Sequence, residues 1–270
     1  MKKLTMLVVT HKQTDIPIID GYKPIVVGNG NVFFSEMYRD NTGDNISNKN
    51  ANYCELTALY WAWKNLNDVE YIGLSHYRRF FMTSLINHTK SGFLPAKKAV
   101  SLLNKYDVIL PYPKGWFDTT VEEWFLCTDG KTEALDKLRM VIADLYPEYL
   151  NDYDKIMNGY MASYFNMFVM SKERLNNYCE WLFSILFQLE GQIDLSEYTP
   201  LQARIYGFLS ERLLNVWVQH NNLKIKYLFV NEIEKDFSIK SNIKDVLKNN
   251  AISKRSLNWM TTFKWGNMKK

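Results

Sequence analysis

The chain has 270 residues, of which 47% are hydrophobic and 15% aromatic, and this is enough to build one sizeable core. No run of about 18 apolar residues occurs, which excludes a conventional membrane-spanning helix. The formal net charge of +4 is unevenly spread, because residues 238–270 carry eight Lys or Arg and one acid, so the other 237 residues sum to −3. A body without excess positive charge argues against a nucleic-acid-binding protein.

The first residues predict a β-strand and not a signal peptide. Two lysines precede a short apolar stretch, but no small-residue cleavage site follows it. The three cysteines, Cys54, Cys127 and Cys179, are odd in number and far apart, a pattern typical of a reducing compartment. We therefore expect a cytoplasmic protein.

Short β-rich runs alternate with amphipathic stretches along the chain. The predicted strands are Leu4–Thr10, Pro24–Val27, Tyr71–Ser75, Asp107–Leu110, Phe165–Met170 and Lys224–Val230. The predicted helices are Ala51–Leu66, one capped by Ser171 that runs through Leu189, and one over about 200–219 that follows Thr199-Pro200. This alternation predicts an α/β domain over residues 1–237, with a mostly parallel sheet flanked by helices. Ligands of such folds bind beyond the carboxyl ends of the strands.

Polar residues follow the first predicted strand directly. Thr10, His11 and Lys12 stand where a strand's carboxyl end would let them reach a bound nucleotide. The alternative is a polar exit from a core strand, and the spacing alone does not separate the two.

A histidine and two arginines follow the predicted strand Tyr71–Ser75. The paired guanidinium groups of Arg78 and Arg79 suit a diphosphate, and His76 can donate or accept a proton or bind a metal. Flanking aromatic residues favour a functional site over a solvated strand end.

A polar loop over residues 39–52 leads into the first predicted helix. Asn50, Tyr53 and Glu55 lie at the start of that helix, where free N–H groups and side-chain amides could meet an anion or sugar hydroxyls. Simple helix capping by Asn48 or Asn50 is the alternative.

One asparagine lies inside the apolar run Phe165–Met170. A buried amide is costly unless it is hydrogen-bonded, so Asn166 must have a partner, which is either backbone or a bound sugar.

A polar stripe marks one face of the last predicted helix. Its members are Arg204, Gly207, Glu211 and Asn215. A carboxylate among large apolar neighbours is suited to general-base work, which makes Glu211 a candidate. An ion pair between Arg204 and Glu211 is the alternative.

Several motifs of other enzyme classes do not occur. The chain has no P-loop, no Gly-x-Gly-x-x-Gly and no Gly-x-Ser-x-Gly, and Gly28-Asn29-Gly30 predicts a turn. ATP-driven and serine-hydrolase functions therefore lose support.

Together these motifs resemble the bacterial family known as domain of unknown function 4422, whose members occur among capsular and exopolysaccharide glycosyltransferases. The residues that carry the resemblance are Thr10-His11-Lys12, Asp40–Ser47, Tyr53–Trp61, His76–Arg79, Asn166–Phe168 and Gly207–Leu214, in order over roughly residues 4–230. The resemblance implies a GT-A-like (Rossmann-like) fold that transfers a hexosyl unit, galactosyl or galactofuranosyl, from a UDP-sugar to a lipid-linked glycan.

The resemblance also implies a function for each candidate residue. Glu211 and His76 would be catalytic. The nucleotide and diphosphate would meet Thr10, His11, Lys12, Arg78 and Arg79, and the donor sugar or acceptor would meet Asn50, Tyr53, Glu55, Asn166 and Arg204. The segment Trp124–Lys131 departs from the family pattern and is expected to face the acceptor.

The order of elements is also similar to glycogenin-like and lipopolysaccharide galactosyltransferases. Ser75-His76-Tyr77-Arg78 stands where those enzymes carry an Asp-x-Asp metal motif. This departure favours a metal-independent reaction in which the arginines neutralise the leaving diphosphate, with Mn²⁺ or Mg²⁺ bound by His76 as the alternative. It also leaves a rival function open, a non-catalytic carbohydrate-binding or scaffold protein of a polysaccharide assembly complex.

The basic tail over residues 238–270 has the pattern of an amphipathic interfacial segment. Apolar residues recur on one helical face with lysines alongside, and two tryptophans and a phenylalanine follow. Docking on the anionic inner face of the cell membrane is one expectation, and a helix folded back on the domain is the other.

Overall fold

The computed structural model describes residues 3–83, 92–115, 118–128 and 130–233, so the predicted tail over 238–270 lies outside the described residues. The strands of the main sheet are β1 (Leu4–Thr10), β2 (Tyr22–Val26), β3 (Tyr38–Arg39), β4 (Tyr71–His76), β5 (Arg79–Met82), β6 (Val108–Pro111), β9 (Phe168–Ser171) and β10 (Ile225–Glu232). A separate pair joins β7 (Lys114–Gly115) to β8 (Met161–Ala162). The α-helices of the described residues are α1 (Asn50–Tyr53), α2 (Leu56–Asn65), α3 (Ala96–Leu103), α4 (Val121–Thr128), α5 (Thr132–Leu145), α6 (Leu150–Met157), α7 (Lys172–Glu190) and α8 (Ile205–His220).

The main sheet is mixed, and the expectation of a mostly parallel sheet is wrong. Within the described residues four strand pairings are parallel, in the set β3–β2–β1–β4 and between β6 and β10. Four are antiparallel, because β9 runs against both β4 and β6, and β5 runs against β4 and β10. An apolar run such as that of β9 reports burial on both faces but carries no information about strand direction.

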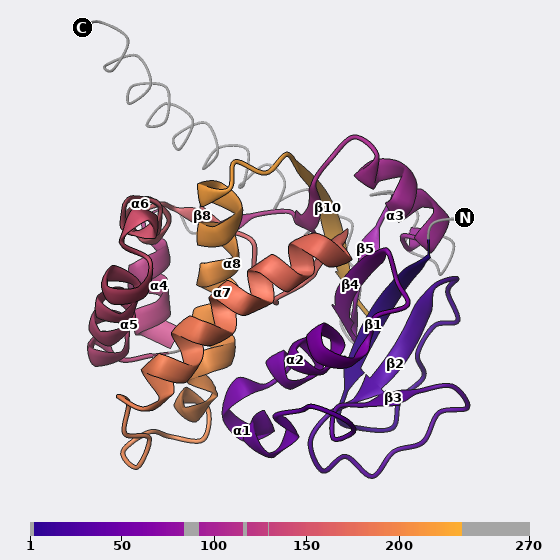
Figure 1. Ribbon diagram of the computed structural model, residues 1–270, viewed down its shortest axis with the longest axis horizontal. Coiled ribbons are helices and arrows are strands. Elements are labelled where there is room, and N and C mark those ends of the chain that lie inside the picture. The colour runs from indigo at the N-terminus through magenta and orange to yellow at the C-terminus, as the bar shows by residue number, and fades with distance from the viewer. Residues whose placement is uncertain (1–2, 84–91, 116–117, 129, 234–270) are drawn as a thin grey trace, which may run out of the picture.

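Both faces of the sheet are covered. Along β1, Leu7 and Val9 belong to the large core beneath α2 and α7, whereas Leu4 and Met6 belong to a second cluster beneath α3. Helices α4, α5 and α6 lie away from the sheet (Figure 1): α5 packs on α7, α6 packs on α8, and α4 packs on α6. Helix α8 therefore lies between the sheet and the outer helices, and different parts of it contact different elements.

The helix boundaries follow local chemistry with two departures. Ser171 caps α7 as predicted, its hydroxyl accepting from the Arg174 N–H at 3.2 Å. Thr199 and Gln202 exchange hydrogen bonds in a capping box, but the chain turns once more before α8 begins at Ile205. The predicted helix over 51–66 is broken at Cys54, which separates α1 from α2.

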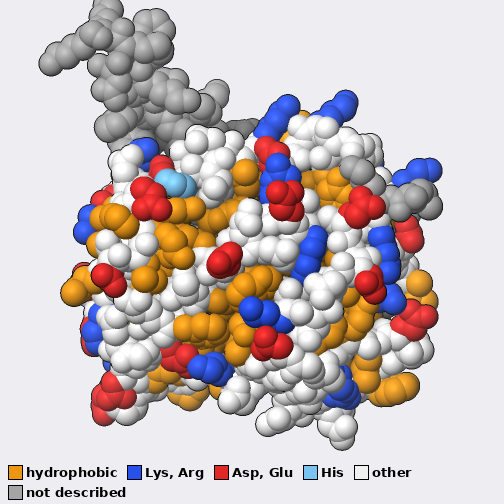
Figure 2. All heavy atoms as spheres, in the orientation of Figure 1, with side chains coloured by type: hydrophobic (Ala, Val, Ile, Leu, Met, Phe, Trp, Pro, Cys, Tyr) orange, Lys and Arg blue, Asp and Glu red, His pale blue; other side chains and the backbone are white. Residues whose placement is uncertain are grey.

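The face drawn in Figure 2 has no large patch of one charge, because acidic and basic side chains are interspersed between apolar patches. No helix among the described residues is both long and apolar enough to cross a bilayer.

Candidate functional site

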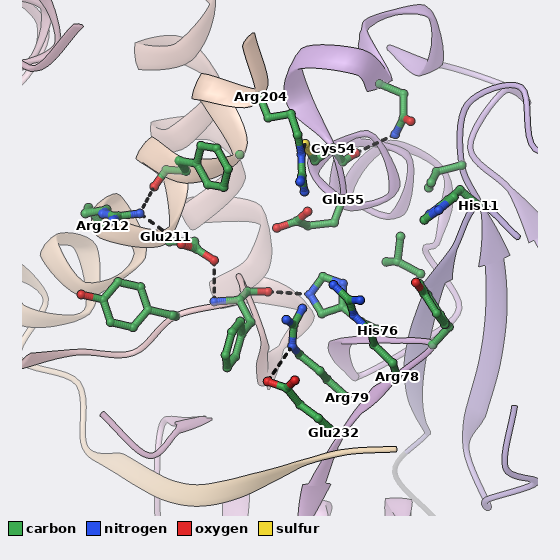
Figure 3. A pocket seen from close by; sticks show the side chains of 18 of the residues that line it. His11, Cys54, Glu55, His76, Arg78, Arg79, Arg204, Glu211, Arg212 and Glu232 are labelled. Atoms are coloured by element: carbon green, nitrogen blue, oxygen red, sulfur yellow. Dashed lines mark hydrogen bonds and ion pairs between the residues drawn. The ribbon is translucent and has the colours of Figure 1, made fainter. Parts of the chain in front are cut away.

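A pocket of about 920 Å³ opens beyond the carboxyl ends of β1 and β4 (Figure 3). One wall is the end of β1 with the β4–β5 hairpin, and the other is the start of α1–α2 with α8. Its charged and histidine side chains are His11, Glu55, His76, Arg78, Arg79, Lys114, Arg204, Glu211, Arg212 and Glu232. Five basic side chains against three glutamates leave the lining net positive, which suits an anionic ligand.

The β4–β5 hairpin delivers both arginines to the pocket. His76 pairs with Arg79 in register across the turn, and the buried Ser75 hydroxyl donates to the Arg79 carbonyl oxygen. The Arg79 guanidinium lies 4.2 Å from the centre of the Phe165 ring, and its Nε is 3.5 Å from a carboxylate oxygen of Glu232 on β10. The turn is thus fixed on both sides while both guanidinium groups line the cavity.

A strained residue turns Glu55 into the pocket. Cys54 has φ of 53° and ψ of −128°, a backbone conformation that residues with a Cβ rarely adopt. The break ends α1 and starts α2 one residue after Glu55, whose side chain then projects into the cavity (Figure 3). The Cys54 thiol accepts a hydrogen bond from Arg204 Nε at 3.1 Å, and burial raises its pKa to about 11, so it stays protonated near neutral pH.

A second strained turn faces the first. Phe165 and Asn166 have φ of 77° and 50°, two successive positive values in residues other than glycine. The Phe165 N–H donates to Glu211 Oε1 at 2.7 Å, and the Phe165 carbonyl accepts from His76 Nε2 at 2.6 Å. Because a carbonyl can only accept, Nε2 carries the proton of the His76 ring.

Asn166 finds its partners inside the protein. Its amide nitrogen donates to Glu55 Oε1 at 2.7 Å and to the Gly207 carbonyl at 3.0 Å, and its oxygen accepts from the Ser210 hydroxyl at 3.0 Å. The side chain is 2% exposed and does not line the cavity. Asn166 therefore reaches the pocket through Glu55, and the expected strand begins only at Phe168.

Glu211 pairs with its neighbour and not with Arg204. Its Oε2 accepts from Arg212 Nη1 at 3.1 Å, and the same nitrogen donates to the Phe208 carbonyl at 3.0 Å. Arg212 is 1% exposed, and its guanidinium lies near the Phe125 and Tyr164 rings. The Arg204–Glu211 ion pair weighed from the helical spacing is replaced by other contacts, because Glu211 pairs with Arg212 while Arg204 donates to the Cys54 thiol.

Both histidines of the pocket favour the neutral form. Burial lowers the pKa of His76, and the nearby Arg79 and Arg78 add to this, while Glu55 and the Phe165 carbonyl oppose it. Partial burial also lowers the pKa of His11, together with the charges of Lys12, Arg78 and Arg204. A neutral His76 can hold the Phe165 carbonyl without adding charge to the pocket.

The structure brings most of the sequence-predicted residues to one cavity. Those that line it are His11, Asn50, Glu55, His76, Arg78, Arg79, Arg204 and Glu211. The amide nitrogen of Asn50 is engaged with the Cys54 carbonyl at 2.8 Å and the Thr57 hydroxyl at 3.0 Å, which is the local capping that the sequence left open.

Besides Asn166, three predicted residues do not line the cavity. Thr10 is 1% exposed, and its hydroxyl donates to the Lys12 carbonyl to close a turn. The Lys12 ammonium lies 4.9 Å from the centre of the Tyr77 ring, outside the lining. Tyr53 is fully buried, stacks on Tyr206 and donates to a Glu190 oxygen at 3.2 Å, because its side of α1 faces α7 and α8.

Several lining residues carried no signal in the sequence. Lys114 on β7 and Glu232 on β10 are far apart in the chain, and only the fold brings them to one site. Of the segment Trp124–Lys131, Trp124 lines the cavity, whereas the Lys131 ammonium donates to the Glu197 carbonyl. In the sequence, Arg212 was part of the family motif Gly207–Leu214 but was not a candidate site residue by itself.

The one Asp-x-Asp triplet of the sequence, Asp152-Tyr153-Asp154, lies on α6 away from the pocket. Asp152 pairs with Lys155 and His220, and Asp154 pairs with Arg139. The chain therefore contains one Asp-x-Asp triplet, but not at the end of β4 next to His76. No group of three or more His, Cys, Asp or Glu side chains suited to a metal ion occurs among the described residues.

Comparison with known proteins identifies similar proteins over most of the chain. A family profile described as domain of unknown function (DUF4422) matches residues 5–222. The solved apo structure of WbbM, a bifunctional glycosyltransferase, is similar with a TM-score of 0.78 and 27% sequence identity. The similarity covers 87% of this chain and 46% of that one, so this chain spans about half the length of its structural neighbour. Among curated proteins none gives a significant match.

Proposed function

Since the chain belongs to the family described as domain of unknown function (DUF4422), we propose that it is a glycosyltransferase of the GT-A-like kind. The reaction that we propose moves a hexosyl unit, galactosyl or galactofuranosyl, from a UDP-sugar to a lipid-linked oligosaccharide in capsular or exopolysaccharide synthesis. The similarity to a bifunctional glycosyltransferase supports the reaction class. The donor, the acceptor and the pathway are our proposal.

One observation carries the proposal: Arg78 and Arg79 line a cavity beyond the carboxyl ends of β1 and β4. This is the position where open α/β sheets bind nucleotides. Guanidinium groups form planar, charge-assisted hydrogen bonds with phosphate oxygens, so the hairpin is suited to the diphosphate of the donor. The base and ribose would then lie toward His11 and Asn50.

The acceptor would meet the aromatic part of the cavity lining. Trp124, Tyr164, Phe165 and Phe208 contribute to it from α4, the segment before β9 and α8. Aromatic faces with a few polar groups between them suit a sugar, which has apolar C–H faces and polar edges.

We propose that the reaction needs no metal ion. Where related enzymes carry metal-binding aspartates, this chain presents His76 with two arginines next to it. The charge that develops on the leaving diphosphate would be neutralised by Arg78, Arg79 and Arg204. We also propose that the protein works at the cytoplasmic face of the membrane, supported by the basic composition of residues 238–270.

The test is binding and turnover of a donor panel: UDP-glucose, UDP-galactose and UDP-galactofuranose, each with EDTA and with added Mn²⁺. We expect saturable binding and release of UDP from one of them, unchanged by EDTA. Activity that EDTA abolishes and Mn²⁺ restores would overturn metal independence. A folded protein that binds glycans but neither binds nor cleaves any nucleotide sugar would instead be the non-catalytic carbohydrate-binding scaffold, which the replaced aspartates alone would favour.

A further inference from the structure

Two of the three glutamates that line the pocket, Glu55 and Glu211, differ in their hydrogen bonds. Both oxygens of Glu211 are engaged, one by the Phe165 N–H at 2.7 Å and the other by Arg212 at 3.1 Å. Glu55 uses Oε1 to accept from Asn166, whereas its Oε2 has no hydrogen-bond donor within the described part of the chain. A carboxylate with one held oxygen and one available oxygen is oriented and still able to accept a proton.

The backbone around Glu55 is strained on both sides of the cavity. Cys54, Phe165 and Asn166 are three of the four residues other than glycine with positive φ in the described chain. Such conformations cost about 1–3 kcal/mol each and persist only where the surroundings enforce them, which is typical of functional sites. Here Cys54 redirects the chain so that Glu55 faces inward, and the Phe165–Asn166 turn supplies the amide that holds it.

Glu55 lies at the start of a helix and close to a cation. It immediately precedes the first turn of α2, where the positive end of the helix dipole lies. Arg204 lies beside it across the cavity and the neutral His76 below it (Figure 3). Glu55 is therefore a carboxylate in a cavity whose other charges attract a diphosphate.

We propose that Glu55 is the general base of the transfer reaction, and that Asn166 and Glu211 are positioning residues that hold it through the Phe165–Asn166 turn. The proposal rests on the proposed transferase function. The acceptor hydroxyl oxygen forms the new bond to the anomeric carbon, and its proton passes to Glu55 Oε2. The bond from the anomeric carbon to the diphosphate breaks with its electron pair leaving on the diphosphate. One such displacement inverts the anomeric configuration.

Glu55→Gln tests this assignment with little disturbance, because the glutamine carbonyl can still accept from Asn166. We expect kcat for UDP release from the donor that the panel identifies to fall about 100-fold or more. The dissociation constant of UDP, measured by calorimetry, should change less than about 3-fold. Glu180→Gln, an exposed substitution on α7, is the matched control and should leave both quantities unchanged.

A pH profile separates the base from its positioning residues. In the wild type kcat/KM should fall toward acidic pH as the base is protonated. That acidic limb should persist in Glu211→Gln, at a lower overall rate, and vanish in Glu55→Gln. Proton NMR of the transfer product should show inversion at the anomeric carbon.

Retained configuration in the product, or Glu55→Gln within about 5-fold of wild-type kcat, would overturn the assignment while the transferase function stands. Loss of the acidic limb in Glu211→Gln but not in Glu55→Gln would give the base to Glu211. A wild-type protein that neither binds nor cleaves any UDP-sugar would overturn both the base and the function on which it rests.

Discussion

Helix α8 carries two clusters of charged side chains that contain similar residue types but differ in their surroundings. Near its start, Glu211 and Arg212 meet the Phe165–Asn166 turn and Glu55, and we call this the pocket cluster. At its end, His220 pairs with Asp152 at 3.0 Å and stacks on Tyr149, in what we call the outer cluster. Each has carboxylates and hydrogen-bonding partners, but the first lines the pocket described above and the second does not.

Backbone strain separates the two clusters as clearly as the cavity does. The pocket cluster contains two successive residues with positive φ, neither of them glycine, in a turn between two strands. Near the outer cluster, Asn222 also has positive φ, but it follows the end of α8, where asparagine in this conformation is a common helix terminator. The comparison teaches that strain without a local structural reason, next to a cavity, is the better guide to function than residue type or motif.

The largest expected effect is on stability, from Arg212→Met in the pocket cluster. The substitution leaves the Glu211 carboxylate without its buried cation, which typically costs about 3–5 kcal/mol of unfolding free energy. Urea denaturation of the folded protein measures this cost. A loss below about 1 kcal/mol would mean that the buried ion pair of the pocket cluster contributes no more to stability than the exposed pairs of the outer cluster.

Two companion variants sharpen that result. Arg212→Met combined with Glu211→Gln should recover part of the loss, because the uncompensated charge is gone. Arg139→Ala removes an ion pair with Asp154 that is about half exposed, and such pairs contribute about 0–1 kcal/mol.

The next largest effect is on catalysis, from Arg78→Ala. Removal of one group that stabilises the leaving diphosphate should lower kcat/KM about 100-fold, by analogy with the loss of a single oxyanion donor. The rate of UDP release measures it, with Arg139→Ala as the control that removes an arginine from the other side of the molecule. Equal rates for the two variants would remove Arg78 from the diphosphate site.

The strand-end half of the pocket could be predicted from the sequence, and the half built on strained backbone could not. His76, Arg78 and Arg79 follow an apolar strand, and the rule that ligands bind beyond strand ends led to them directly. The spacing of apolar residues predicted one helix over 51–66, because this spacing carries no information about the backbone break at Cys54 that orients Glu55.

The same limit applies to the residues around Asn166. The apolar run predicted a strand from Phe165, whereas the Phe165 N–H donates to Glu211 and the Phe165 carbonyl accepts from His76, which holds a turn there instead. Those partners are distant in sequence, so no local pattern reports them. Strand direction also depends on partners that are distant in sequence, so the sequence did not predict that β9 runs antiparallel to β4.

A smaller effect separates strain from side-chain function at the turn. Asn166→Gly and Asn166→Ala both remove the amide that holds Glu55, but glycine adopts a φ of 50° freely. We expect the glycine variant to be more stable than the alanine variant by about 1 kcal/mol. Both should lose donor turnover to a similar extent, measured by UDP release.

The matched pair at Asn222, near the outer cluster, should show the same stability order with unchanged turnover. Turnover that tracks stability instead, with the glycine variant at Asn166 nearly as active as the wild type, would reduce the amide of Asn166 to a structural role.

The smallest expected effect comes from the outer cluster, with Asp152→Asn. Asp152 and Asp154 form the only Asp-x-Asp triplet of the sequence, but their oxygens pair with Lys155, His220 and Arg139 at the far side of α8. We expect a loss of less than about 1 kcal/mol in unfolding free energy and no change in UDP release, with or without EDTA. A fall in turnover that added Mn²⁺ restores would mean that this motif serves a metal after all, and would erase the distinction between the two ends of α8. If turnover is unchanged in Asp152→Asn but lost in Arg78→Ala, the result would support neutralisation of the leaving diphosphate by the arginines of the β4–β5 hairpin and not by a metal at the Asp-x-Asp triplet.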